Sequence, residues 1–222
     1  MPSGIISRLG QIRSLIPAGV ELVAVSKFKP IEDLKEAYEG GQRLFGESRV
    51  QELLSKIPLM PEDVKWHFIG HLQTNKVRQI VGKAALIESV DSERLLEVID
   101  REGARLGLQT DVLLQVHVAR EETKFGFLPD EIKGFFAEGG FRRYPYVRIR
   151  GIMAMASNTE DTARVRKDFA EAAAIFGEIK RSLSEGSENF NVLSMGMSGD
   201  WPLAVEEGST LVRIGSAIFG ER

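Results

Sequence analysis

Eight short runs of almost continuous apolar residues recur along the chain, and they constrain its fold more than any other feature of the sequence. Runs of this kind, without strict alternation of polar and apolar residues, are typical of parallel strands that are covered on both faces. We expect strands at Leu22–Ser26, Leu44–Glu47, Trp66–Gly70, Ala85–Val90, Val112–Val118, Ile149–Met155, Val192–Met195 and Leu211–Ser216.

Segments with the spacing of amphipathic helices lie between these runs. In one of them, Ile31, Leu34 and Tyr38 fall on a single helical face, and in another, Ser92 is of the residue type that caps a helix N-terminus. We expect helices over Ser3–Ile16, Ile31–Glu39, Thr74–Val81, Ser92–Leu106 and Asp161–Leu183.

Strands that alternate with helices predict a parallel α/β fold. The 222 residues divide into roughly 28 for each of eight units, which suits a compact (β/α)8 barrel. An open, doubly wound sheet is the alternative, but the chain has no clear glycine-rich dinucleotide loop. We therefore expect a single barrel domain over residues 1–222, with an extra helix before the first strand.

Composition and charge exclude several classes of function. The 29 Lys and Arg residues against 32 Asp and Glu give a net charge of −3, so a nucleic-acid partner is not expected. The absence of cysteine excludes disulfides, thiolate zinc sites and cysteine nucleophiles. No apolar run approaches the roughly 20 residues of a membrane span, and the N-terminus lacks a signal-peptide pattern, so we expect a cytoplasmic protein without a membrane partner.

The three histidines show no spacing that suggests a metal site. His67 and His117 lie within apolar runs and are expected to pack in the core, whereas His71 follows a strand and is placed near the barrel mouth. The sequence also lacks the GxSxG motif of serine hydrolases. We expect neither a metal ion nor a Ser/His/Asp triad.

The active site of a (β/α)8 barrel lies at the carboxyl ends of its strands. Lys27 leaves the first predicted strand at this position. Its side chain either extends into water or is a partly desolvated amine that can form a Schiff base with an aldehyde or ketone. The spacing alone leaves both interpretations open.

Small and hydroxyl residues follow the last two predicted strands. Ser198 comes after the seventh strand, and Gly215 and Ser216 end the eighth. In this fold the loops after strands seven and eight form a recurrent phosphate site, where backbone N–H groups and a helix N-terminus meet the anion. These residues are candidate phosphate ligands, although glycine and serine also fill ordinary turns.

Arg213 lies inside the otherwise apolar eighth run, two residues before Gly215. A buried guanidinium needs a partner. Either a core carboxylate such as Glu47 or Glu88 supplies it, or the arginine donates to a ring nitrogen or an anionic group of a ligand.

These segments resemble the pyridoxal 5′-phosphate homeostasis proteins, the YggS/PROSC family, over nearly the whole chain. The final block, LSMGMSGDWPLAVEEGSTLVRIGSAIFGER, is the most specific part of the match. The matching segments are Val23–Pro30, Leu44–Glu52, Trp66–Val77, Leu113–Phe127, Gly151–Ser157 and Leu193–Arg222.

The resemblance implies a fold type III barrel, similar to the N-terminal domain of alanine racemase, that binds pyridoxal 5′-phosphate. It implies that Lys27 holds the cofactor as an internal aldimine and that Arg213 faces the pyridine nitrogen. Because arginine does not readily give up a proton, that nitrogen stays unprotonated and the ring is a weaker electron sink. By the same resemblance, Ser198, Gly215 and Ser216 bind the phosphate.

One position departs from the family pattern. Ser48 stands where the family usually has asparagine, and it offers one short hydroxyl instead of an amide. We leave Ser48 out of the expected cofactor site.

The family resemblance predicts a non-catalytic carrier or regulator of intracellular pyridoxal phosphate, with apo-enzymes that need the cofactor as recipients. An amino-acid racemase is the alternative, but it needs a second acid/base opposite the lysine. In alanine racemase a second domain supplies a tyrosine for that role, and this chain ends at Arg222, soon after its last predicted strand. A class I aldolase that uses Lys27 is a third hypothesis, based on the fold alone.

Overall fold

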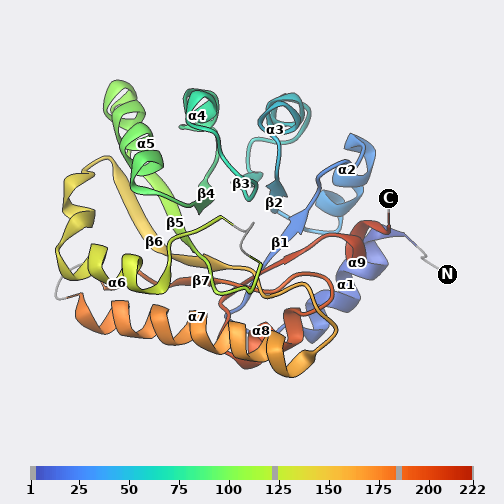
Figure 1. Cartoon of the computed structure of the whole chain (residues 1–222). Helices are drawn as coiled ribbons and strands as arrows, with labels where there is room; N and C mark the ends of the chain where they lie inside the picture. The colour runs from blue at the N-terminus through green and yellow to red at the C-terminus, as the bar shows by residue number, and fades with distance from the viewer. Residues whose placement is uncertain (1–3, 122–124, 184–186, 222) are drawn as a thin grey trace.

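All eight apolar runs form strands, and the strands close into one parallel barrel in chain order (Figure 1). This description covers residues 4–121, 125–183 and 187–221, the part of the chain that the structure, a computed structural model, describes. Each strand pairs with the next, and β8 pairs with β1 to complete the ring. The strands are β1 (Glu21–Val25), β2 (Leu44–Glu47), β3 (Lys65–Phe68), β4 (Leu86–Val90), β5 (Thr110–Val116), β6 (Val147–Ala154), β7 (Val192–Ser194) and β8 (Leu211–Ile214).

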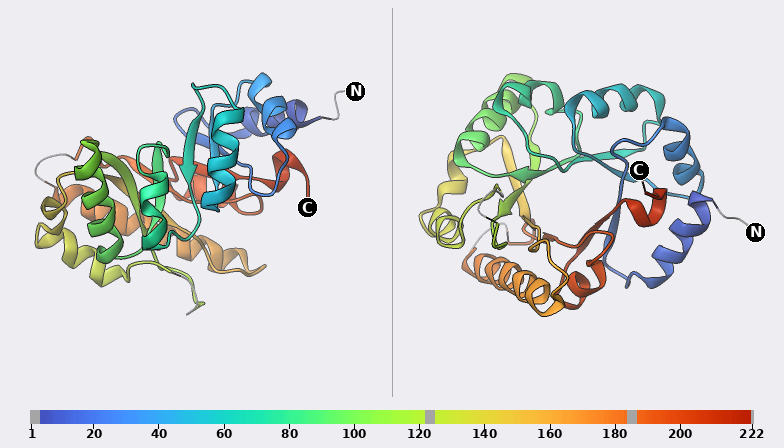
Figure 2. Two further views of the ribbon diagram at one scale, coloured as in Figure 1. Left: turned by 90° about the horizontal axis from the view of Figure 1, so that it is seen from above. Right: turned by 45° about the vertical axis from the view of Figure 1, so that its right-hand side comes forward.

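Helices cover the outside of the barrel as a ring, which the right-hand view of Figure 2 shows almost from the end. The additional helix α1 precedes β1 and packs beside α9 near the C-terminus. The helices are α1 (Ile5–Leu15), α2 (Ile31–Glu39), α3 (Val50–Lys56), α4 (Val77–Ile80), α5 (Glu93–Leu106), α6 (Pro129–Ala137), α7 (Thr162–Ser182), α8 (Trp201–Glu206) and α9 (Ser216–Phe219). None of these helices, in the part of the chain described, is long and apolar enough to cross a membrane.

The expected helices are confirmed, with small changes at their ends. The Ser92 hydroxyl accepts the Leu95 N–H at 3.4 Å and caps the N-terminus of α5, and Gly107, in the left-handed conformation, caps its C-terminus. The predicted segment Thr74–Val81 splits into a 3-10 turn followed by the short helix α4. Ser3, the predicted first residue of α1, lies outside the described residues.

Six predicted strands end earlier than expected, three of them by two residues, because their last residues turn into the loops of the barrel mouth. Trp66–Gly70 stops at Phe68, and Leu211–Ser216 stops at Ile214 because Ser216 begins α9. The placement of His117 on the fifth strand was wrong. β5 ends at Val116, where Phe127 of the following loop takes over the hydrogen bonds, and the His117 N–H donates to the Phe127 carbonyl.

Side chains inside the barrel form an apolar layer and a polar layer. Leu86, Leu113 and Met153 make up a small buried cluster of their own. Glu88 lies two residues after Leu86 on β4, and because side chains alternate along a strand, it faces the same barrel interior. The corresponding step from Val192 along β7 and from Leu211 along β8 leads to Ser194 and Arg213, so these polar side chains lie nearer the carboxyl ends of their strands than Leu86, Val192 and Leu211 do.

Candidate functional site

A pocket of about 380 Å³ opens at the carboxyl ends of the strands. Its walls come from the ends of β1, β3, β6 and β8, and from the loops after β2 and β7. All five residues that the sequence singled out line this one pocket, and they are Lys27, Ser198, Arg213, Gly215 and Ser216. Apolar side chains form other parts of its lining, namely Val25, Ile69, Met153, Met155 and Met197.

Lys27 reaches the pocket because it continues the interior face of β1, two residues after Val25. The residue is half-buried, and it lines the pocket. The next residue, Phe28, has a φ of 63°, a value that side chains other than glycine rarely adopt.

The loop after β7 and the end of β8 meet at Ser198 and Gly215. The Gly215 N–H donates to the Ser198 hydroxyl oxygen at 3.1 Å. A Cβ on Gly215 would lie 3.1 Å from the Val25 carbonyl oxygen, so glycine permits the close approach of β8 to β1 here. The loop itself is closed by Asp200, whose carboxylate accepts the Met197 N–H at 2.6 Å.

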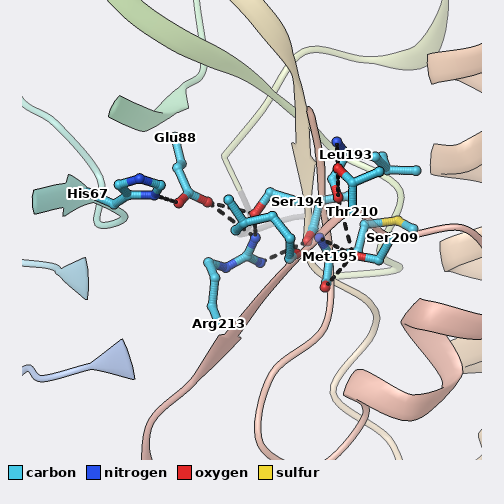
Figure 3. A network of polar contacts seen from close by, with 10 residues as sticks. His67, Glu88, Leu193, Ser194, Met195, Ser209, Thr210 and Arg213 are labelled. Atoms are coloured by element: carbon cyan, nitrogen blue, oxygen red, sulfur yellow. Dashed lines mark hydrogen bonds and ion pairs between the residues drawn. The ribbon is translucent and has the colours of Figure 1, made fainter. Parts of the chain in front are cut away.

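Arg213 is buried, and its guanidinium has three partners in the barrel interior (Figure 3). It donates to the Ser194 hydroxyl and, at 3.0 Å, to the Ala154 carbonyl oxygen. Its Nη1 lies 3.5 Å from the Glu88 carboxylate. Of the two carboxylates considered from the sequence, Glu88 is therefore the partner, and the arginine reaches the pocket as well.

Glu88 connects Arg213 to His67. The carboxylate lies 2.7 Å from His67 Nδ1 and accepts the Ser194 hydroxyl at 2.6 Å. Burial raises the pKa of Glu88, but the His67 hydrogen bond and charge, together with Arg213 and Ser194, bring it below its ordinary value. Burial also lowers the pKa of Arg213, and the charges of Glu88 and Asp200 oppose that shift. The expectation that His67 is a satisfied core residue is confirmed.

Glu47, the other carboxylate considered for Arg213, faces α3 instead. It accepts hydrogen bonds from the Lys56 ammonium at 2.8 Å and from the Ser26 hydroxyl at 2.6 Å. Burial raises the pKa of Glu47, and these two hydrogen bonds oppose the increase.

Three polar residues that the sequence did not assign to the site also line the pocket, namely Lys29, Ser48 and Glu221. Lys29 donates to the carbonyl oxygens of Gly220 and Glu221 at 2.9 and 3.0 Å, and so ties the C-terminal segment to the mouth. Lys29 lies two residues after Lys27, and this spacing was the signal in the sequence that could have placed it in the pocket. Ser48 also lines the pocket, although we left it out of the expected set.

The other two histidines lie away from the pocket lining. His71 is exposed at the mouth, where its Nδ1 lies 2.9 Å from Asp91 and its ring stacks on Phe125 at 3.9 Å. His117 is partly buried, and its Nε2 has no hydrogen-bond partner among the described residues.

The model of the alanine racemase N-terminal domain family matches residues 3–222. A protein of Aquifex aeolicus is 39% identical, over 91% of this chain and 87% of its own length. A protein of Schizosaccharomyces pombe is also 39% identical, over 91% of this chain and 84% of its own. Both are named pyridoxal phosphate homeostasis protein.

The chain belongs to the pyridoxal phosphate homeostasis protein family. The resemblance seen in the sequence motifs is thereby confirmed. PipY of Synechococcus elongatus has the same fold, with 38% identity and a TM-score of 0.91 over 97% of this chain and all of that one. A second structure of PipY, with pyridoxal phosphate bound, superposes with a TM-score of 0.86.

Alanine racemase shares the barrel with this homeostasis-family chain. The enzyme of Clostridium difficile is 14% identical with a TM-score of 0.78, and the match covers 99% of this chain but 57% of the racemase. This likeness shows the fold alone.

Proposed function

We propose that this protein binds pyridoxal phosphate reversibly in the pocket at the barrel mouth and acts in cytoplasmic pyridoxal phosphate homeostasis, as a carrier or regulator without turnover of its own. The convergence of a lysine amine, a guanidinium and two hydroxyls on one pocket carries the proposal. The names of the relatives and the PipY structure with bound cofactor support it.

The donor set of the pocket fits this cofactor. Pyridoxal phosphate supplies an electrophilic aldehyde and an aromatic ring that withdraws electrons. The Lys27 amine can condense with the aldehyde carbon with loss of one water, and hydrolysis reverses the step. The Ser198 and Ser216 hydroxyls and the Gly215 N–H are donors for the phosphate, and Met153 and Met155 offer apolar contact to the ring.

Arg213 restrains carbanion chemistry in this account. Its guanidinium keeps its proton and is held by Ser194 and the Ala154 carbonyl. Facing the pyridine nitrogen, it leaves that atom unprotonated, and the ring is then a weak electron sink. A site of this kind retains the cofactor without activating bound amino acids strongly.

The three tyrosines of the chain lie away from the pocket lining, which favours the carrier over a racemase. The Tyr38 hydroxyl donates to Asp63 at 2.8 Å, and the Tyr144 hydroxyl donates to Glu93 at 3.1 Å. Tyr146 lies just before β6, at the end of the barrel opposite the pocket. A racemase would need an acid/base of this kind facing the amine.

The mouth is accessible enough for exchange with apo-enzymes. Ser216 and Met197 are exposed, and Lys27 is half-buried. A cofactor held there can be attacked by water or by the lysine of a recipient enzyme. We propose apo-enzymes that require pyridoxal phosphate as the recipients.

A transfer experiment tests the proposal. The loaded protein is mixed with an apo-aminotransferase, and reactivation is compared with that by free cofactor at equal concentration. In parallel, alanine and other amino acids are incubated with the loaded protein and analysed on a chiral column. Reactivation without racemisation is expected. Failure to take up the cofactor, or appreciable turnover of any amino acid, contradicts the proposal.

A further inference from the structure

Lys27 lies in a tight turn whose geometry is unusual for its sequence. The Lys29 N–H donates to the Ser26 carbonyl oxygen at 3.0 Å, which closes a four-residue turn with Lys27 and Phe28 at its centre. Phe28 has a φ of 63°, the sole positive value at a non-glycine residue in the described part of the chain. Turns with a positive φ at their third residue usually carry glycine there, because this conformation costs free energy for a residue that has a side chain.

Glu52 of α3 contacts the backbone of Phe28. Its Oε1 accepts the Phe28 N–H, and its side chain is 18% exposed. Phe28 as a whole residue is 42% exposed, and the Arg49 guanidinium carbon lies 4.4 Å from the centre of its ring. The carboxylate therefore provides a directed contact to the backbone of the strained residue.

The same α3 helix also fixes the residue on the other side of Lys27. The buried Lys56 ammonium donates to the Ser26 carbonyl oxygen at 2.9 Å and to Glu52 Oε1 at 2.9 Å. It donates to Glu47 as well, which in turn accepts the Ser26 hydroxyl. One network of charged groups thus binds the turn at its first and its third residue.

This network lies outside the barrel wall, whereas the Lys27 side chain lines the pocket inside it. We propose that Glu52 is a positioning residue for Lys27. By holding Phe28 in the left-handed conformation, it fixes the direction in which the lysine side chain leaves the turn. The inference rests on the proposed role of Lys27 in holding pyridoxal phosphate, and it explains why a strained phenylalanine can follow that lysine.

Rescue by glycine tests the inference. Glu52→Ala should weaken binding of pyridoxal phosphate about tenfold, because Phe28 relaxes and the amine moves away. Glu52→Gln keeps an acceptor oxygen for the N–H and should stay within about threefold of the wild type. The double variant Glu52→Ala/Phe28→Gly should regain most of the affinity, since glycine adopts a positive φ without support. Gln51→Ala, at an exposed position on the same helix, is the matched control.

Three readouts separate positioning from folding: the affinity from an absorbance titration, the rate at which borohydride-trapped Lys27 adduct accumulates, and the Tm. The expected pattern is loss in Glu52→Ala and recovery in the double variant, with Gln51→Ala unchanged. If Glu52→Ala does not fold, Phe28→Val and Phe28→Gly in the native chain replace it. The β-branched residue should weaken binding and glycine should preserve it.

The inference is overturned if Glu52→Ala binds like the wild type, if Phe28→Gly fails to rescue it, or if Phe28→Val and Phe28→Gly bind equally well. Absence of cofactor uptake by the wild-type protein is a different result, because it contradicts the proposed function itself.

Discussion

The Ser198 hydroxyl oxygen accepts the Gly215 N–H at 3.1 Å, and this contact joins the loop after β7 to the end of β8. Both residues line the pocket, so the proposed phosphate site has the amide and the hydroxyl already adjacent.

Ser198→Ala should therefore reduce affinity for pyridoxal phosphate about tenfold, since it removes a hydrogen bond to a charged group. Affinity for pyridoxal, which lacks the phosphate, should not change. Absorbance titrations with both ligands measure the two values, and Ser14→Ala on the surface of α1 serves as the control. Equal losses for both ligands would show that Ser198 does not contact the phosphate.

Removing one partner of the ion pair between Arg213 and Glu88 should destabilise the protein strongly. Arg213→Met removes the permanent cation beside the fully buried Glu88, which keeps its contacts with His67 and Ser194, and should lower the free energy of unfolding by about 3–5 kcal/mol. In a chain that already carries Arg213→Met, Glu88→Gln should lower the free energy of unfolding by less than it does in the wild-type chain. Urea unfolding of the single and double variants should give a coupling energy above about 1 kcal/mol.

The surface pair Lys133 and Glu178, 2.7 Å apart, provides the comparison. Its coupling energy should stay below about 1 kcal/mol. Equal coupling for the two pairs would refute a special role for the interior one.

Glu88 and Glu47 should affect acid stability in opposite directions. The pKa of Glu88 is below its ordinary value in the folded protein. The unfolded chain therefore takes up this proton first, and the stability that Glu88 contributes is present above about pH 4.5 and is lost as the pH falls further. The Glu47 pKa is raised by burial, so the folded protein binds that proton first and this site favours folding at lower pH.

Free energies of unfolding measured at pH 6 and pH 3.5 test the direction of the pH effect predicted for each of the two carboxylates. The acid-induced loss of stability should be smaller in Glu88→Gln than in the wild type and larger in Glu47→Gln. A change in the same direction for both variants would contradict these assignments.

Two glycines of the loop after β7 should tolerate alanine very differently. Gly196 has a φ of 90°, and a Cβ there would lie 2.7 Å from the Ala204 Cβ and 2.8 Å from the Trp201 Cα. Gly196→Ala should therefore destabilise the protein by about 2 kcal/mol or more. A Cβ on Gly199 would meet no atom of the described residues within 4 Å, so Gly199→Ala should change stability by less than about 0.5 kcal/mol. Thermal unfolding of the two variants compares them directly, and equal losses of stability would contradict the prediction.

The barrel and most of the pocket could be predicted from the sequence, because both follow from the pattern of apolar runs and from the order of the strands along the chain. Apolar runs mark the strands, and the carboxyl ends of parallel strands meet at one face, which brings Lys27 and Arg213 together although they are far apart in sequence. Ser198 and Gly215 follow from the same rule.

Contacts that depend on side-chain direction could not be predicted in the same way. The choice between Glu47 and Glu88 as partner of Arg213 depends on which face of its strand each carboxylate occupies, and the four-residue strand β2 is too short to show this by alternation. The network of Lys56 and Glu52 was missed because we assigned no helix to α3. The spacing of Val50, Leu53 and Leu54 was a signal for it.

The most direct test of the account is the location of the cofactor on the chain. The protein is incubated with pyridoxal phosphate, reduced with borohydride, digested and mapped by mass spectrometry. The account predicts one modified residue, Lys27, with no modification in Lys27→Ala and normal modification in Lys35→Ala, a variant on the exposed side of α2. Labelling that persists in Lys27→Ala, or that spreads evenly over surface lysines, would contradict it.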